Sequence, residues 1–193
     1  MAFDNNLITI TDIQEFKPLS KNTDTDKTVN PFILEAQEFD IRPILSDAFY
    51  SELITQIKSG SPSAEYDELF NGSIYSDGGI DKTNPGLKSV LVYYSYSRYL
   101  NRANTNSTAF GMVQKNNPDS TPISDKRLAS LISQSESGAK AYENRVIDFL
   151  ICNSNKYPLY ECVKENRRTG GLRISAAGQG NKRYYDKITK RYI

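Results

Sequence analysis

The chain has 193 residues, with 24 Lys and Arg against 23 Asp and Glu, and its formal net charge is +1. Hydrophobic residues make up 38% of the chain, below the roughly 45–50% of an average globular domain, so we expect one domain with a modest core. The sequence contains no histidine, which excludes Ser-His-Asp triads, histidine general bases and every metal site that needs a histidine ligand.

Cysteine usage and the N-terminus predict the compartment. Cys152 and Cys162 are too few for a four-cysteine metal site, and their spacing does not match a CxxC redox motif. We therefore expect reduced thiols in a cytosolic protein, with no metal and no other cofactor. The first residues lack the basic and apolar regions of a signal peptide, and no apolar run approaches the ~20 residues of a membrane span.

Charge divides the chain into two parts. Residues 154–193 hold ten Lys and Arg against three Asp and Glu, a net charge of +7, and the remainder holds 14 against 20, a net charge of −6. We predict a helical body over 1–153 and a basic C-terminal arm over 154–193 that becomes ordered on assembly. A solvated tail with no binding role is the alternative interpretation.

The first half of the chain predicts several helices. Thr11 can cap a short helix from Asp12. Asn30 and Pro31 form the cap and first position of a longer helix, which Pro43 should kink or restart. After this proline, apolar residues recur three and four positions apart, as on one buried helical face: Ile44, Leu45, Ala48, Phe49, Leu53 and Ile57.

A short helix should follow Gly60-Ser61-Pro62, with Tyr66, Leu69 and Phe70 as its apolar residues. Residues 71–79 are rich in glycine and serine and predict a loop or a small hairpin. This segment does not end in Gly-Lys-Ser/Thr, so it does not match a phosphate-binding loop.

Asn84 and Pro85 repeat the cap-and-proline start, and the helix after them is apolar on two sides, which predicts a central position. This helix carries a cluster of four tyrosines: Tyr93, Tyr94, Tyr96 and Tyr99. Such rings can stack on nucleic-acid bases, but at helical spacing tyrosines are more often core residues, and we favour that interpretation.

Residues 104–122 have no helical period. We predict a short strand over 108–113 and a turn over 116–119. A long loop in a small helical protein is often functional.

Ser124 should cap the longest helix, with Asp125 in its first turn. Small residues at Ser135, Gly138 and Ala139 would let another backbone approach closely, either within the chain or in a second copy. The predicted inward positions alternate by four and three: Leu128, Ile132, Ser135, Ala139, Tyr142, Val146 and Phe149.

The arm has no sustained period, so it should not form a core of its own. Residues 172–175 alternate like a short strand, and residues 184–193 are basic and aromatic.

The carboxylate pairs on predicted helices match solvated faces better than catalytic pairs; examples are Glu35 with Glu38 and Glu65 with Glu68. Arg183, Tyr184 and Tyr185 superficially suggest a tyrosine recombinase, but that chemistry also needs a histidine, and we predict that the protein is not an enzyme. Together the patterns predict a mainly α protein: a small helical bundle with a long extended loop or short hairpin and an extended C-terminal arm.

Four stretches carry a resemblance to a known family. They are Asn30-Pro31-Phe32-Ile33 with Glu35-Ala36-Gln37, Asp40-Ile41-Arg42-Pro43-Ile44-Leu45-Ser46-Asp47-Ala48-Phe49-Tyr50, Tyr93-Tyr94-Ser95-Tyr96-Ser97-Arg98-Tyr99 and Thr108-Ala109-Phe110-Gly111-Met112-Val113-Gln114-Lys115. In their order and spacing, over roughly residues 8–160, the chain resembles head-tail connector proteins of phages and prophages of Bacteroidetes, including the crAss-like phages. The insertion at 71–79 and the arm beyond 165 lie outside the resemblance.

The resemblance implies a ring, commonly twelve-fold, beneath the portal vertex, which extends the DNA channel and docks the next tail component. Expected partners are further copies of the chain, the portal protein, the next tail or ring component and the genomic DNA that passes through the channel. The expected location is the head-tail junction of the virion, after assembly in the host cytoplasm, with no membrane contact.

Within this interpretation the loop and the arm should lie at subunit or portal interfaces, because arginine side chains suit bidentate contacts with carboxylates. The candidate interface residues are Phe110, Met112, Val113, Ser135, Gly138, Ala139, Arg167, Arg168, Arg173, Ile174, Tyr184 and Tyr185. The main alternative is a nucleic-acid-binding protein that uses the basic arm with Tyr184, Tyr185 and Tyr192. An enzyme that relies on Asp and Glu alone is a third alternative.

Overall fold

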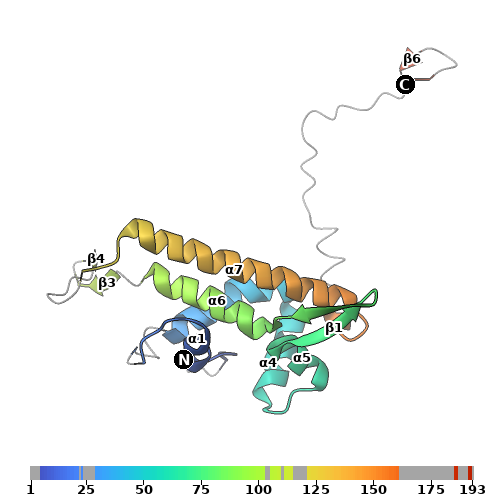
Figure 1. Ribbon diagram of the computed structural model, residues 1–193, viewed down its shortest axis with the longest axis horizontal. Helices are drawn as coiled ribbons and strands as arrows, with labels where there is room; N and C mark the ends of the chain where they lie inside the picture. The colour runs from blue at the N-terminus through green and yellow to red at the C-terminus, as the bar shows by residue number, and fades with distance from the viewer. Residues whose placement is uncertain are drawn as a thin grey trace.

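A computed structural model of the chain describes residues 5–21, 23, 29–102, 105–109, 111–114 and 121–160, and the backbone of 185–186 and 191–192. The described chain is mostly helical, as predicted. Two long helices, α6 (Gly86–Asn101) and α7 (Asp125–Cys152), lie side by side along the long axis of the molecule (Figure 1). The remaining helices pack along α6 and around one end of this pair.

The first helix, α1 (Ile10–Phe16), begins with a reciprocal capping box. The Asp12 backbone N–H donates to the Thr9 hydroxyl at 3.5 Å, and the Thr9 N–H donates to the Asp12 carboxylate at 2.7 Å. The predicted cap at Thr11 is therefore wrong by two positions, because only the extended backbone at Thr9 lets its side chain reach the first turn.

The next helix, α2 (Asn30–Ala36), starts at the predicted proline motif and runs into a wider π-helical turn, η2 (Gln37–Ile41). In this turn the Arg42 N–H donates to the Gln37 carbonyl, five residues back. Pro43 follows directly and has no N–H to donate, so the predicted disturbance at Pro43 takes the form of a widened turn.

Two helices follow the π turn: α3 (Arg42–Leu45) and α4 (Asp47–Lys58). Ser46 separates them with a φ of 77°, and its side chain accepts a hydrogen bond from the first turn of α4. This break rotates α4, so the predicted inward residue Ala48 is exposed and Tyr50 is buried in its place.

Helix α5 (Ala64–Asn71) leads into an antiparallel hairpin of β1 (Ser73–Asp77) and β2 (Ile80–Asn84), one of the two predicted forms of this segment. The two-residue turn between the strands has positive φ at both positions, which its two glycines allow.

The start of α6 crosses the end of α5 at very short range. Asn84 supports the crossing, since its amide donates to the Glu68 carbonyl at 2.8 Å and its Oδ1 accepts from the Gly86 N–H at 3.0 Å. Gly86 has a φ of +80°, and a Cβ at this position would lie 2.5 Å from the Phe70 carbonyl oxygen. Only glycine fits here without displacing backbone.

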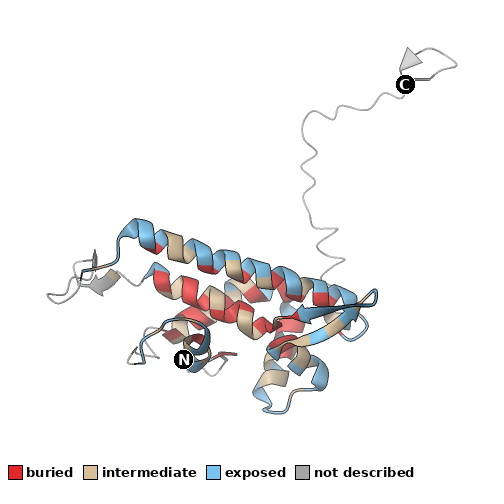
Figure 2. Ribbon diagram, viewed as in Figure 1, coloured by how far each residue is buried: buried red, intermediate tan, exposed pale blue. Residues whose placement is uncertain are grey.

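Helix α6 is the central helix, as its two apolar sides predict. It packs against α7, α2, α5 and α1, and its buried residues form a continuous stripe (Figure 2). The largest fully buried side chains of the core are Tyr157, Phe49, Phe149, Ile8, Ile13, Ile33, Ile41, Leu45, Leu53, Leu69, Leu87 and Leu91. Between α6 and α7 the chain forms a second hairpin, β3 (Thr105–Thr108) with β4 (Gly111–Gln114), at the opposite end of the molecule from β1 and β2 (Figure 1).

Helix α7 starts as predicted, with the Ser124 hydroxyl accepting from the Arg127 N–H. The body continues past the predicted boundary at 153, because Tyr157 and Tyr160 are only 1% and 4% exposed. The Tyr157 ring lies 6.0 Å from that of Phe49 and 5.8 Å from that of Phe149. Beyond Tyr160 the structure describes a two-residue antiparallel pairing of β5 (Tyr185–Asp186) with β6 (Arg191–Tyr192), while the rest of the predicted arm lies outside the described residues.

The crossing at Gly86 yields a stability prediction. Gly86→Ala forces an L side chain into a left-handed backbone and onto the Phe70 carbonyl, so we expect a loss of at least about 3 kcal/mol in the free energy of unfolding. Gly60→Ala is the matched control, since Gly60 has a φ of +74° but no atom within 4 Å, and we expect a loss of about 1–2 kcal/mol. Urea unfolding measures both, and equal losses would contradict the predicted overlap.

Candidate functional site

The small residues of α7 lie against α6 of the same chain, the first of the two predicted alternatives. The Ser135 hydroxyl donates to the Tyr93 carbonyl at 2.9 Å, and a Cβ on Gly138 would lie 2.6 Å from Cε1 of Tyr93. Ala139 is fully buried beside them. These three residues therefore pack α7 against α6 within the chain, with Ser135 and Ala139 buried and Gly138 partly exposed. Their role in contacts with a second copy stays a prediction.

The structure describes only some of the other candidate interface residues. Val113 lies on β4 with 45% of its surface exposed. Only the backbone is described for Met112 and Tyr185. The remaining candidates lie outside the described residues, so their role stays a prediction: Phe110, Arg167, Arg168, Arg173, Ile174 and Tyr184.

A polar pocket of about 360 Å³ lies where η2 meets the facing sides of α6 and α7. Sequence reasoning missed it, because its residues come from three separate segments and match no motif. Its lining consists of Asp40, Tyr94, Ser97, Arg98, Asn101, Glu136 and Lys140.

An arginine clamp joins η2 to α6 in this pocket. Arg98 binds Asp40 through two parallel hydrogen bonds, at 2.9 Å from Nε and 3.0 Å from Nη2, and Glu35 lies 3.7 Å from Nη1. Burial lowers the pKa of Arg98, but the hydrogen bonds and charge of Asp40 outweigh this effect and raise the pKa overall. The guanidinium thus remains charged and held in one orientation.

A buried carboxylate joins α6 to α7. Glu143 is 6% exposed; it accepts from the Tyr94 hydroxyl at 2.7 Å and from the Lys140 ammonium at 2.5 Å. Burial and the neighbouring carboxylate raise the pKa of Tyr94, so its hydroxyl stays a donor. Glu136 accepts from the Ser97 hydroxyl at 3.1 Å. Tyr94, Glu143 and Lys140 therefore connect α6 to α7, and we call this set of contacts the brace. Because these side chains bind one another, they offer no free acid-base pair.

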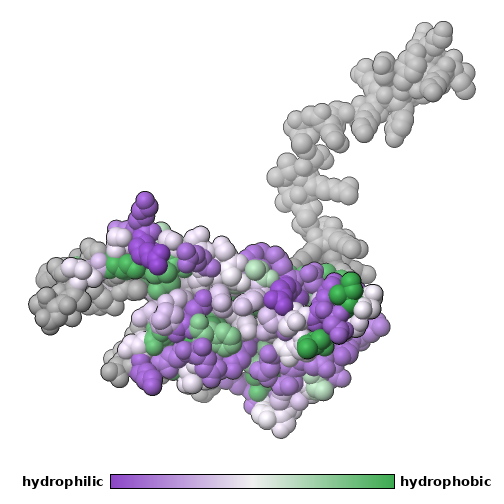
Figure 3. Space-filling model, viewed as in Figure 1, coloured by the Kyte–Doolittle hydropathy of each residue, from purple (hydrophilic) through white to green (hydrophobic). Residues whose placement is uncertain are grey.

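Apolar side chains are exposed at both ends of the molecule. On the β1–β2 hairpin, Ile74 and Ile80 are 75% and 67% exposed. Val113 on β4 and Ile123 just before α7 are 45% and 37% exposed at the other end. Figure 3 shows hydrophobic surface at both ends, set among hydrophilic side chains. Phe39 on η2 and Phe16 on α1 are also exposed, at 66% and 49%, so exposed apolar side chains are not confined to the ends. Isolated apolar residues are common on surfaces, but the pairs at the two ends lie on or beside the hairpins and are candidate contact surfaces.

Two further features are not found in the described ranges. These ranges contain no group of three or more acidic or cysteine side chains that could hold a metal ion. In the same ranges, no helix combines the length and apolar character needed to cross a membrane.

Comparison with known proteins places the chain in a family. The model of a family of unknown function, DUF6712, matches residues 41–170, more than half of the 193-residue chain. The chain belongs to this family. No curated protein and no solved structure matches it. The match begins in η2 and extends beyond Tyr160, so it includes both long helices and both hairpins.

The brace around Glu143 yields a second stability prediction. Tyr94→Phe removes one of the two donors to a buried carboxylate, so we expect a loss of about 1–3 kcal/mol in the free energy of unfolding. Tyr99→Phe is the control, because Tyr99 is also half-buried on α6 but its hydroxyl has no hydrogen bond recorded to the described residues. The loss for this variant should stay below about 0.5 kcal/mol. Denaturant unfolding compares the two variants, and equal small losses would show that Tyr94 does not brace α7.

Proposed function

We propose that the protein is a structural component of a phage virion, a head-tail connector that assembles as a ring beneath the portal. The ring extends the DNA channel and docks the next tail component. The main support is the placement of exposed hairpins and apolar side chains at both ends of one elongated helical body.

This geometry suits a subunit held between two partners. A connector needs a body that keeps its shape while each end binds a different protein. The α6–α7 pair provides such a body, since the close approach at Gly138 and the brace at Glu143 fix the two helices together. The β1–β2 hairpin at one end and the β3–β4 hairpin at the other provide separate contact surfaces.

The distribution of charge also supports the proposal. The predicted body, residues 1–153, carries a net charge of −6, and residues 154–193 carry +7. An acidic channel wall would not retain DNA phosphates during ejection, whereas basic side chains in the arm can bind carboxylates of a neighbouring subunit or of the portal.

Nucleic-acid binding is the second candidate function, and the +7 charge of residues 154–193 favours it. The tyrosines of α6 do not add to this case. The Tyr93 ring packs on Tyr142 at 5.1 Å, the Tyr94 hydroxyl binds Glu143, and Tyr96 stacks on Tyr99 at 6.2 Å. No row of free rings is left on this helix to stack on bases, so binding would depend on the arm.

Deletion of residues 165–193 tests the connector proposal. We expect the truncated chain to keep nearly all of its helical circular-dichroism signal, because α1 to α7 all precede Tyr160, and to lose assembly as measured by light-scattering mass. A full-length variant with Arg167, Arg168 and Arg173 changed to Lys is the matched control for charge without the guanidinium fork, and we expect partial assembly.

Normal assembly of the truncated chain would remove the arm from the mechanism. A monomer of the full-length chain that binds duplex or single-stranded DNA with a steep salt dependence would favour the nucleic-acid function instead.

A further inference from the structure

One edge of the β1–β2 hairpin is open. The two-residue turn makes Asp77 and Ile80 the closing hydrogen-bonded pair, and pairing then alternates along the strands. The N–H and C=O groups of Ile74 and Ser76 therefore point away from β2. Within the described ranges, the structure records no hydrogen bond to these four backbone groups.

The opposite edge of the hairpin is contacted at one point, although the side chains of β2 before Asn84 are exposed. Arg145 of α7 donates to the Thr83 carbonyl on the outer side of β2 at 2.9 Å. The open edge of β1 also carries Ile74, the most exposed large apolar side chain in the described part of the chain at 75%. Proteins seldom leave an apolar strand edge uncovered, because such an edge pairs with any available strand.

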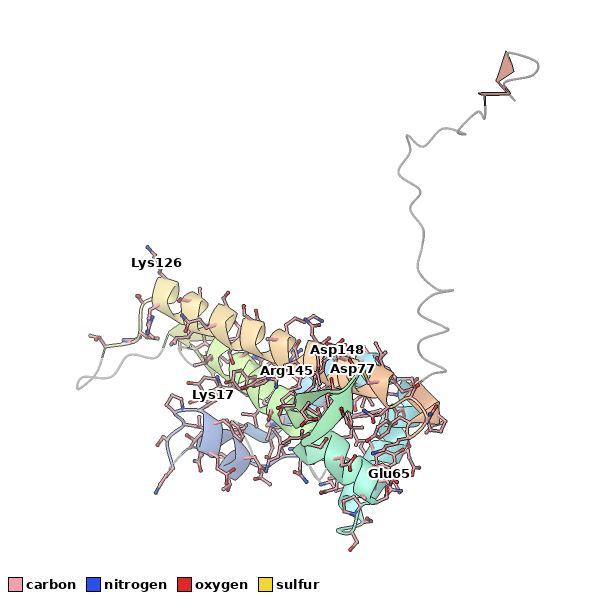
Figure 4. All side chains as sticks on the ribbon, turned by 45° about the vertical axis from the view of Figure 1, so that its right-hand side comes forward. Lys17, Glu65, Asp77, Lys126, Arg145 and Asp148 are labelled. Carbon is pink, nitrogen blue, oxygen red and sulfur yellow. The ribbon has the colours of Figure 1, made fainter. Side chains whose placement is uncertain are left out.

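Three carboxylates and two cations lie on or beside the hairpin: Asp77, Asp81 and Asp148, with Lys82 and Arg145. Asp77 and Asp148 lie near each other where α7 passes the hairpin (Figure 4). Asp77 is paired with Lys82 at 2.5 Å, but neither Asp81 nor Asp148 has an ion pair among the described side chains. A basic segment would therefore find unpaired carboxylates beside the open edge.

The chain leaves the described body close to this hairpin. The Tyr75 ring of β1 lies 5.2 Å from Phe149, and Phe149 lies 5.8 Å from Tyr157. Residues 161–193 follow, with nine Lys and Arg against three Asp and Glu, and they include the strand-like sequence Leu172-Arg173-Ile174-Ser175. The residues between Tyr160 and this sequence can span up to roughly 35–40 Å. A link this short gives a local concentration on the order of millimolar, which favours the chain's own segment over a second copy.

We propose that residues 172–175 dock on the open edge of β1 of the same chain as a third strand. Leu172 and Ile174 would lie beside Ile74 on one face of the extended sheet, and Arg173 would lie on the other face with Asp77. The neighbouring arginines of the arm would bind Asp81 and Asp148. This inference concerns the isolated chain, so it goes beyond the connector function and does not depend on a portal or a ring.

Cross-linking in the full-length chain tests this docking. In a background with Cys152→Ser and Cys162→Ser, Ser76→Cys places a thiol at the open edge, and Ala176→Cys places one just after the docked strand. We expect a short bismaleimide to form an intrachain product at a rate that does not depend on protein concentration. The matched control combines Lys126→Cys at the far end of α7 (Figure 4) with Ala176→Cys, and we expect it to react at least tenfold more slowly.

A second pair of variants tests the apolar contact. Ile74→Lys, at an exposed position that should not disturb folding, should slow the 76–176 cross-link at least fivefold. Phe39→Lys, at a site on η2 that is 66% exposed, should leave the rate unchanged.

Three outcomes would overturn the proposal: a 76–176 rate equal to that of the control, a rate unaffected by Ile74→Lys, or products that join two chains only. The last outcome would assign the edge to a second copy. None of these outcomes bears on whether rings form on a portal, so failure of the docking and failure of the connector function are distinguishable.

Discussion

The close approach of α6 and α7 at Gly138 is the contact on which the rest of the structure depends. Because Gly138 has no side chain, the Tyr93 ring lies directly against the backbone of α7, and Ser135 can bind the Tyr93 carbonyl. Glu143 continues the same interface through Tyr94. With α7 fixed on one side, α6 receives α1, α2 and α5 on its other sides, and the two hairpins are held at opposite ends of the pair.

Much of this arrangement could be predicted from the sequence, because local signals and packing agree. Ser124 caps α7, and the small residues of α7 do meet a close neighbour. Features that depend on contacts between distant segments could not be predicted. The polar pocket joins Asp40, Arg98 and Glu136 from three elements. The division of charge predicted a body that ends at 153, yet aromatic packing buries Tyr157 in the core.

Membership in a family of unknown function leaves the activity to be inferred from the surfaces. The side chains of the polar pocket bind one another, as the Arg98–Asp40 pair shows, and so this pocket supports rigidity more than chemistry. The exposed isoleucines and the open strand edge lie at the ends instead. A rigid body with contact surfaces at its ends is what the connector proposal needs, and docking of the arm on β1 would keep one such surface covered in the free chain.

Electron microscopy of the full-length chain, mixed with the portal protein encoded in the same genome, tests the connector function most directly. The account predicts a ring of identical subunits bound coaxially beneath the portal, with the long α6–α7 pairs related by the symmetry of the ring. A chain that leaves the portal bare at concentrations well above those of the portal subunits, and that forms no ring alone, would contradict it.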